Sequence, residues 1–177
     1  MQTQTVAESA PLREELMERL FMDMKVERFN ELYYQIRAKT TKHLITSANI
    51  VAALAASTAL TGMLRNGPGA SLIAFQLLMA VAAVSAAVGP LMGLESSYAR
   101  LEKAALGHQI ARGRLWSLLR DLKLSDLDGS HEARANEIGA FLDALSALDE
   151  APRERVRRSC WEKVEREYPA EKAWTII

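Results

Sequence analysis

The chain has 177 residues, which suits one domain of ordinary size, and its 22 basic and 22 acidic side chains give a formal net charge of zero. Bulk charge therefore favours neither a nucleic acid nor an acidic partner. The charges are unevenly distributed, because Arg65 is the only charged residue between His43 and Leu94. Helices of a soluble core usually keep a charged face along their whole length, so this segregation indicates a membrane protein.

The cysteine and histidine content excludes several kinds of site. Cys160 is the single cysteine, which excludes an internal disulfide and a cysteine-rich zinc site. The three histidines, at positions 43, 108 and 131, lack metal-ligand spacing. No Gly-rich phosphate loop, paired-carboxylate signature or nucleophile motif is present. The sequence therefore predicts no catalytic residue, no metal, no cofactor and no enzyme activity, and the first 30 residues predict no cleaved signal peptide.

Residues 1–43 are predicted to form an amphipathic N-terminal helix on the cytoplasmic side. Pro11 is suited to the start of that helix. Apolar residues follow it at helical spacing, at Leu12, Leu16, Leu20, Met24, Phe29, Leu32, Tyr33 and Ile36.

Two uncharged runs follow, over residues 44–64 and 70–94. At ~1.5 Å per residue, a helix as long as either run reaches across a bilayer core of about 30 Å. The segment 65–69 between them is rich in Gly and Pro and predicts a tight turn. We therefore expect an all-α protein with a transmembrane helical hairpin over 44–94; a buried hairpin in a soluble bundle is the alternative. Basic residues flank the two runs on the side of the termini, so the positive-inside rule predicts that both termini lie in the cytoplasm. These residues are Arg37, Lys39, Lys42, Arg100 and Lys103.

Small and polar residues in the two runs are the candidate functional positions. In the second run, Leu77, Val81 and Val84 lie on a predicted lipid face. Away from that face, small residues predict close helix packing, at Ser85, Gly89 and Gly93. Uncharged polar residues need hydrogen-bond partners in hydrocarbon. The candidates for lining a pore or for making interhelical hydrogen bonds are Thr46, Asn49, Ser57 and Gln76. For Asn49 and Gln76, each taken alone, we favour the interhelical hydrogen bond.

Residues 95–177 are predicted to be a cytoplasmic helical region. Its first helix continues the second span without a break, and a loop at 125–130 ends with Ser130 as the N-cap of the next helix. Two shorter helices follow, marked by Ile138–Leu148 and Val156–Tyr168, with Pro152 opening the second. These helices are expected to pack with the N-terminal helix as a bundle.

A basic cluster lies at the start of the last predicted helix, at Arg153, Arg155, Arg157 and Arg158. It could bind phosphate, but five glutamates lie close by, so a solvated helix face is the favoured interpretation. No nucleic acid is expected as a partner.

The motif Glu27–Tyr34 and the basic segment Arg37–Lys42, followed by a tight hairpin and a long helix, resemble the SLATT family of two-transmembrane bacterial effectors. The resemblance covers most of Leu12–Leu124. It implies an inner-membrane effector of anti-phage or conflict defence that oligomerises and makes pores when triggered. The implied partners are membrane lipid, further copies of the chain, and a separate sensor or nucleotide-signalling protein.

Two other interpretations stay open. One is a non-catalytic, membrane-anchored scaffold whose helical bundle recruits a partner protein. The other is a holin-like lysis protein, which the long C-terminal portion disfavours.

Overall fold

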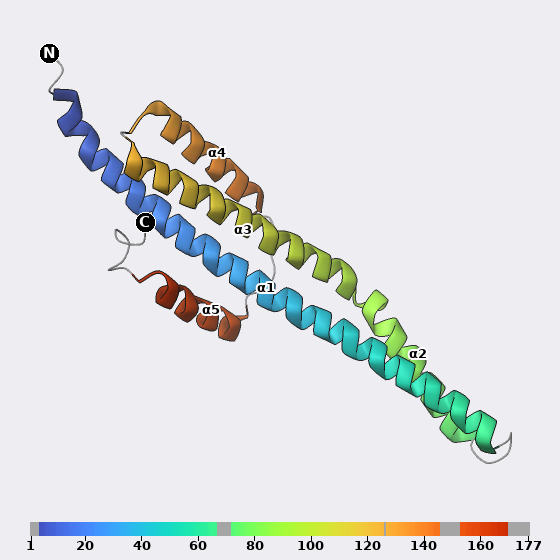
Figure 1. The fold of residues 1–177 in the computed structure, drawn as a ribbon. Helices are drawn as coiled ribbons and strands as arrows, with labels where there is room; N and C mark the ends of the chain where they lie inside the picture. The colour runs from blue at the N-terminus through green and yellow to red at the C-terminus, as the bar shows by residue number, and fades with distance from the viewer. Residues whose placement is uncertain (1–3, 67–71, 126, 146–152, 170–177) are drawn as a thin grey trace. The chain divides into compact units, whose positions relative to one another are not determined.

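The computed structural model describes residues 4–66, 72–125, 127–145 and 153–169. Within these ranges every regular element is a helix, which confirms the all-α prediction: α1 (Gln4–Asn66), α2 (Leu72–Leu91), α3 (Leu94–Leu124), α4 (Gly129–Leu145) and α5 (Glu154–Glu167) (Figure 1). The chain folds as two compact units. We call Met1–Ile36 with Glu102–Ile177 the bundle unit, and Arg37–Leu101 the hairpin unit.

The main core of the bundle unit is formed by α1, α3 and α4. Met24 of α1 and Leu118 and Leu122 of α3 are at most 1% exposed. Spacings of three and four residues place such side chains on one face of each helix. The other buried members are Met17, Leu20, Phe21, Leu115, Leu119 and Ile138 of α4.

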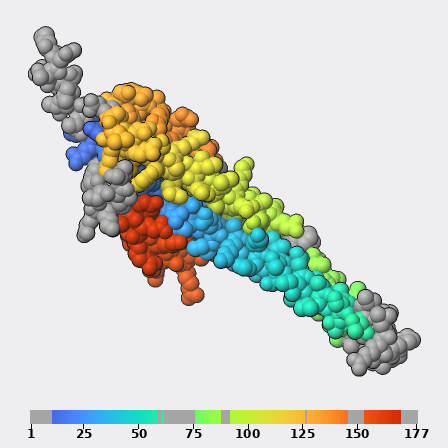
Figure 2. All heavy atoms as spheres, in the orientation of Figure 1, coloured from blue at the N-terminus to red at the C-terminus, as the bar shows by residue number. Residues whose placement is uncertain are grey.

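A second apolar cluster fastens α5 to α1. Cys160 and Val164 of α5, each at most 1% exposed, pack against Leu32 and Tyr33 of α1. Figure 2 shows the corresponding contact between the red and blue helices. Burial raises the pKa of the Cys160 thiol, although Lys163 opposes this shift. The backbone N–H of Arg153 donates a hydrogen bond to the Tyr33 hydroxyl at 3.1 Å, which fixes the start of α5.

Two predicted helix boundaries are wrong. Helix α1 begins at Gln4, so Pro11 lies inside the helix, where its missing N–H leaves one carbonyl without its usual partner. The helix after the second predicted span is separate from it, because α2 ends at Leu91 and Gly93 adopts φ 59° before α3. This left-handed conformation ends an α-helix and favours glycine. The segments 67–69 of the predicted turn and Pro152 lie outside the described residues.

The predicted N-cap of α4 is also wrong, because Asp128 caps the helix instead of Ser130. One carboxylate oxygen of Asp128 accepts hydrogen bonds from the backbone N–H groups of Ser130 and His131 at 3.0 and 3.2 Å. The Ser130 hydroxyl donates to the same oxygen at 2.6 Å. The Ser130 hydroxyl bond is the main cause that lowers the pKa of Asp128 from 3.8 to about 2.

Asp128→Ala should therefore speed hydrogen exchange at the Ser130 amide, since it removes the acceptor of that N–H. The His131 amide should change less, because the Asp128 backbone carbonyl also accepts from it at 3.1 Å. Because the folded-state pKa is lowered, the wild-type cap is fully present above the ordinary carboxyl pKa of 3.8 and weakens as the pH falls towards about 2. Exchange measured by mass spectrometry at two pH values tests this. Asp143→Ala, an exposed change on the same helix, should leave both amides unaffected.

In the hairpin unit, α1 and α2 lie side by side (Figure 1). Ala55 and Ala82 are buried at 7% and 8% exposure, whereas Leu54, Leu77 and Val84 are each more than 60% exposed. Judged on the described residues, none of the helices is both long and apolar enough to cross a membrane. The structure thus supports a pair of helices here but not the two predicted spans at 44–64 and 70–94.

Candidate functional site

The polar candidates of the hairpin unit are all exposed. Thr46, Asn49 and Ser57 lie on α1, and Gln76 lies on α2. The Ser57 hydroxyl donates to the Ala53 carbonyl of its own helix at 2.8 Å. Within the described part of a single chain, neither Asn49 nor Gln76 makes an interhelical hydrogen bond. The structure therefore leaves both amides on the surface, where lipid, water or another copy can reach them.

The small-residue candidates fall into three different settings. Ser85 is half-buried, next to the buried Ala82 on the same side of α2. Gly89 belongs to α2, but its surroundings lie outside the described residues. Gly93 adopts φ 59°, and an added Cβ would come 3.3 Å from the Ser96 hydroxyl oxygen. Because any L side chain is strained at this φ, Gly93 ends the helix whatever its part in packing.

The pairing of α1 with α2 uses small side chains at alternating spacings of three and four. The least exposed positions of α1 in this unit include Ala48, Ala52 and Ala55, and those of α2 include Leu78, Ala82 and Ser85. Such a pattern is typical of two helices packed along a narrow seam.

Ala82→Leu should destabilise this helix pair by about 1–3 kcal/mol, because a tightly packed seam has no room for the added carbons. Ala86→Leu adds the same atoms one turn further along, at an exposed position, and should leave the pair unchanged. Thermal unfolding followed by circular dichroism compares the two. Equal losses of stability would mean that Ala82 is not at the seam.

The bundle unit contains a cluster of buried charged groups that the sequence interpretation missed. Glu27 and Glu31 lie one turn apart on α1, and His108 and Arg112 lie one turn apart on α3. A Glu27 carboxylate oxygen is 2.6 Å from Nδ1 of His108, and both residues are 5% exposed. Arg112 Nε donates to Glu31 at 2.8 Å. The equal four-residue spacings were the signal available in the sequence.

Arg28 extends this cluster to α5. Its guanidinium donates two hydrogen bonds to the Glu167 carboxylate, at 2.8 and 3.1 Å, and one to Glu31 at 3.0 Å. The bond to Glu167 raises the pKa of Arg28 and lowers the pKa of Glu167. The Tyr34 ring stacks on His108, with centroids 5.3 Å apart. The cluster thus ties α3 and α5 to the same two turns of α1.

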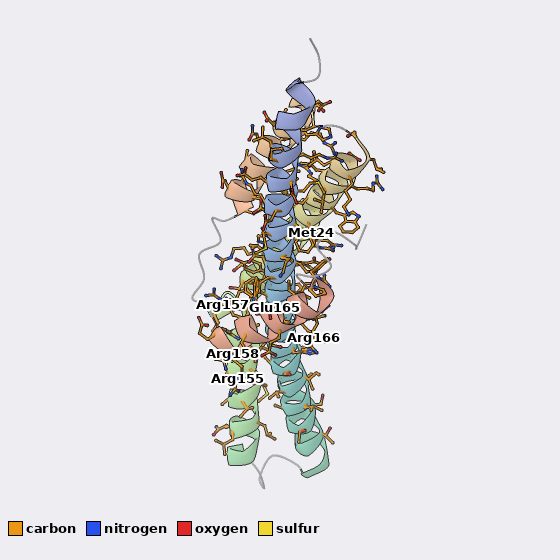
Figure 3. The ribbon with its side chains drawn as sticks, turned by 90° about the vertical axis from the view of Figure 1, so that its left-hand side faces the viewer. Met24, Arg155, Arg157, Arg158, Glu165 and Arg166 are labelled. Carbon is orange, nitrogen blue, oxygen red and sulfur yellow. The ribbon has the colours of Figure 1, made fainter. Side chains whose placement is uncertain are left out.

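The basic cluster of α5 divides between two environments. Arg157 and Arg158 line a groove of about 650 Å³ between α5 and α1, together with Trp161. Arg155 is exposed and lies outside that lining, and Arg153 precedes the helix as its N-cap. Figure 3 labels Arg155, Arg157 and Arg158 along α5. The structure therefore joins half of the predicted cluster to a concave surface.

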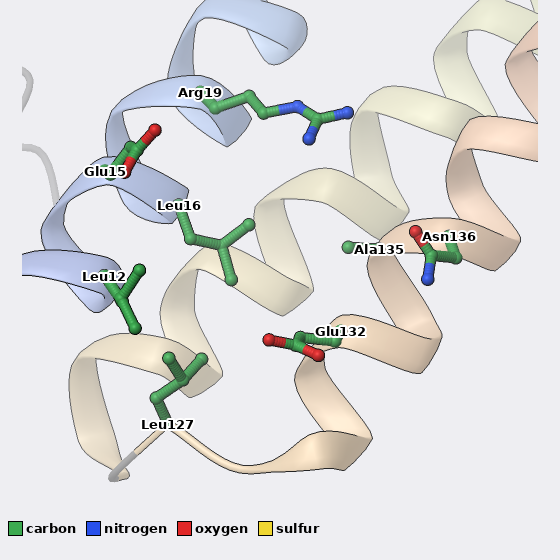
Figure 4. Close-up of a pocket in the computed structure, with 8 residues that line it drawn as sticks. All are labelled: Leu12, Glu15, Leu16, Arg19, Leu127, Glu132, Ala135 and Asn136. Carbon is green, nitrogen blue, oxygen red and sulfur yellow. The ribbon is translucent and has the colours of Figure 1, made fainter. Parts of the chain in front are cut away.

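A second cavity, of about 340 Å³, lies between α1 and the start of α4 (Figure 4). Leu12, Leu16 and Leu127 form its apolar side, and the polar side chains come from Glu15, Arg19, Glu132 and Asn136. Among the described residues, no three His, Cys, Asp or Glu side chains are grouped closely enough to hold a metal ion.

Comparisons with protein-family models, with curated proteins and with solved structures find no match for the chain. The site must therefore be interpreted from its own residues.

Proposed function

We propose that the protein is a bacterial inner-membrane effector that oligomerises through its hairpin unit and permeabilises the membrane when triggered, in anti-phage or conflict defence. The observation that carries this proposal is the apolar surface of the hairpin unit. Eight large apolar side chains there are 44–64% exposed: Leu44, Ile50, Val51, Leu54, Leu77, Met79, Val81 and Val84. Large apolar side chains exposed in this number on one pair of helices are unfavourable in water and favour cover by lipid or protein.

The composition of the hairpin unit supports lipid as part of that cover. Arg65 is the only charged residue between His43 and Leu94, so few ionised groups oppose contact of this part of the chain with hydrocarbon. Two helices cannot enclose a conduit, so permeabilisation needs several copies of the chain. In this proposal the exposed amides of Asn49 and Gln76 turn towards water or towards a neighbouring copy in the assembly. Both termini are placed in the cytoplasm in this proposal, next to the basic flanks.

Reconstitution into liposomes tests the proposal. The full chain should resist alkaline extraction. The rate at which the liposomes release an encapsulated dye should rise more steeply than linearly with the density of protein in the membrane. If Asn49 and Gln76 face the conduit, Asn49→Leu and Gln76→Leu should reduce release while oligomer size stays constant; if they hold copies together, the same changes should dissociate the oligomer. Leu124→Ala, an exposed apolar change in the bundle unit, serves as the control and should leave dye release unchanged.

Two results would overturn the proposal in different ways. Complete extraction at alkaline pH would show that the hairpin unit does not insert. Stable insertion without dye release, even at high density and in cells with the neighbouring genes present, would leave a membrane-anchored scaffold as the better interpretation.

A further inference from the structure

The groove between α1 and α5 combines surfaces of different chemistry. On the α1 side it is lined by Val26, Phe29 and Asn30, which share one face of the helix. On the α5 side it is lined by Glu154, Arg157, Arg158 and Trp161, which also share one face. Its volume of about 650 Å³ lies within the ~300–1,000 Å³ typical of small-molecule sites.

The aromatic part of the groove offers ring surface to a ligand. The rings of Phe29 and Trp161 meet edge to face, with centroids 5.8 Å apart and planes at 70°. Both residues are only half-buried, so part of each ring is accessible from the groove. Such accessible aromatic faces bind other planar rings by stacking.

The cations of the groove are only partly neutralised. Arg157 has one loose ion pair, to Glu154 at 3.5 Å, and Arg158 has no ion pair or hydrogen bond to any described residue. Lys25 does not line the groove, but its ammonium lies 5.8 Å from the centroid of the Trp161 ring, and the residue is only 7% exposed. In the described part of the chain, no carboxylate pairs with Lys25. A buried charge without a counter-ion is unfavourable, and a bound anion nearby would relieve that cost.

We propose that this groove binds a soluble phosphate ester that carries a planar aromatic ring, a ligand of nucleotide size. Arg157 and Arg158 bind the phosphate oxygens, because guanidinium groups match their geometry and donate charge-assisted hydrogen bonds. Phe29 and Trp161 contact the ring, and Lys25 adds positive charge behind Trp161. This site does not depend on the membrane function proposed above.

The charge of α5 favours a small soluble ligand over a membrane surface. The helix carries five basic and four acidic side chains, so its net charge is close to zero. Binding to anionic lipid needs an excess of basic residues, of the order of four to eight. In the groove lining itself, two basic residues, Arg157 and Arg158, stand against one acidic residue, Glu154.

Calorimetric titration of the purified full chain with adenosine 5′-monophosphate tests the proposal. We expect saturable binding at one site per chain. Arg157→Ala with Arg158→Ala should weaken it about tenfold or more, because two charged hydrogen-bond donors are lost. The matched control combines Arg155→Ala with Arg166→Ala, which removes the same charge from the same helix outside the groove lining. It should change the affinity less than about twofold, as expected for screened surface charges.

Several outcomes would overturn the site. Equal weakening by both double variants would mean non-specific charge attraction. If inorganic phosphate binds as tightly as the nucleotide, the aromatic side chains do not contact the ligand. If binding is seen only with vesicles of phosphatidylglycerol, the groove is a lipid site. Absence of binding in a wild-type chain with native circular dichroism would also refute the proposal.

Discussion

Val84→Lys is expected to remove the protein from the membrane fraction. Val84 lies near the middle of α2 and is 64% exposed in a single chain. If this surface faces hydrocarbon, a lysine there costs about 2.5–3.5 kcal/mol, which corresponds to a shift of roughly 100-fold in the insertion equilibrium. If the surface faces water, the same change falls within about ±0.5 kcal/mol and has no visible effect.

The measurement is the fraction of protein that remains in the membrane pellet after alkaline extraction. Leu106→Lys is the matched control, because Leu106 is 55% exposed but belongs to the bundle unit. That variant should stay with the membrane, and Val84→Leu should do so as well. Retention of Val84→Lys in the pellet would mean that this side of α2 does not contact lipid.

Glu27→Ala is expected to lower the stability of the bundle unit by about 1–3 kcal/mol. The change leaves His108, which is 5% exposed, without the carboxylate that lies 2.6 Å away. A buried polar group that loses its hydrogen-bond partner costs about 1–3 kcal/mol, because it keeps its desolvation penalty. Thermal or denaturant unfolding followed by circular dichroism measures the loss.

A double variant distinguishes the stability that the Glu27–His108 pair contributes from the cost of leaving one partner buried alone. Glu27→Leu combined with His108→Leu should recover most of the stability, since apolar groups of similar size can replace a buried pair at little cost. Glu165→Ala, at an exposed position on α5, is the control and should have a small effect. If the effects of the two leucine substitutions simply add, the two side chains are not coupled.

The helices and their buried faces could be predicted because apolar spacing is a local property of the sequence. Leu115, Leu118 and Leu122 recur at three and four residues, and all three are at most 2% exposed in the structure. The ends of the helices were harder to predict from the sequence than their buried faces. Asp128 and Ser130 are both good capping residues, and only the path of the loop decides which carboxylate or hydroxyl reaches the free N–H groups. Gly93 likewise does not reveal from its identity that it adopts a left-handed conformation.

The side-chain clusters depend on contacts between residues far apart in the chain. The spacing of Glu27 and Glu31 matches that of His108 and Arg112, but the sequence does not say which turns of α1 and α3 meet. The same holds for the groove, where the rings of Phe29 and Trp161 are in contact although the two residues are far apart in the sequence. The pattern of small and apolar residues in α2 was visible, but the exposure of Leu77 and Val84 is a property of the folded pair of helices.

Because Cys160 is buried, its reactivity reports how often α5 opens away from α1. It is the single cysteine of the chain and is 1% exposed between α5 and α1. An alkylating reagent reacts with the thiolate, so labelling must wait until α5 opens away from α1 and the thiol can ionise in water. When closing is faster than alkylation, the labelling rate gives the free energy of that opening. A ligand that bridges α1 and α5 must lower the rate of Cys160 labelling, because α5 can open only after the ligand has dissociated.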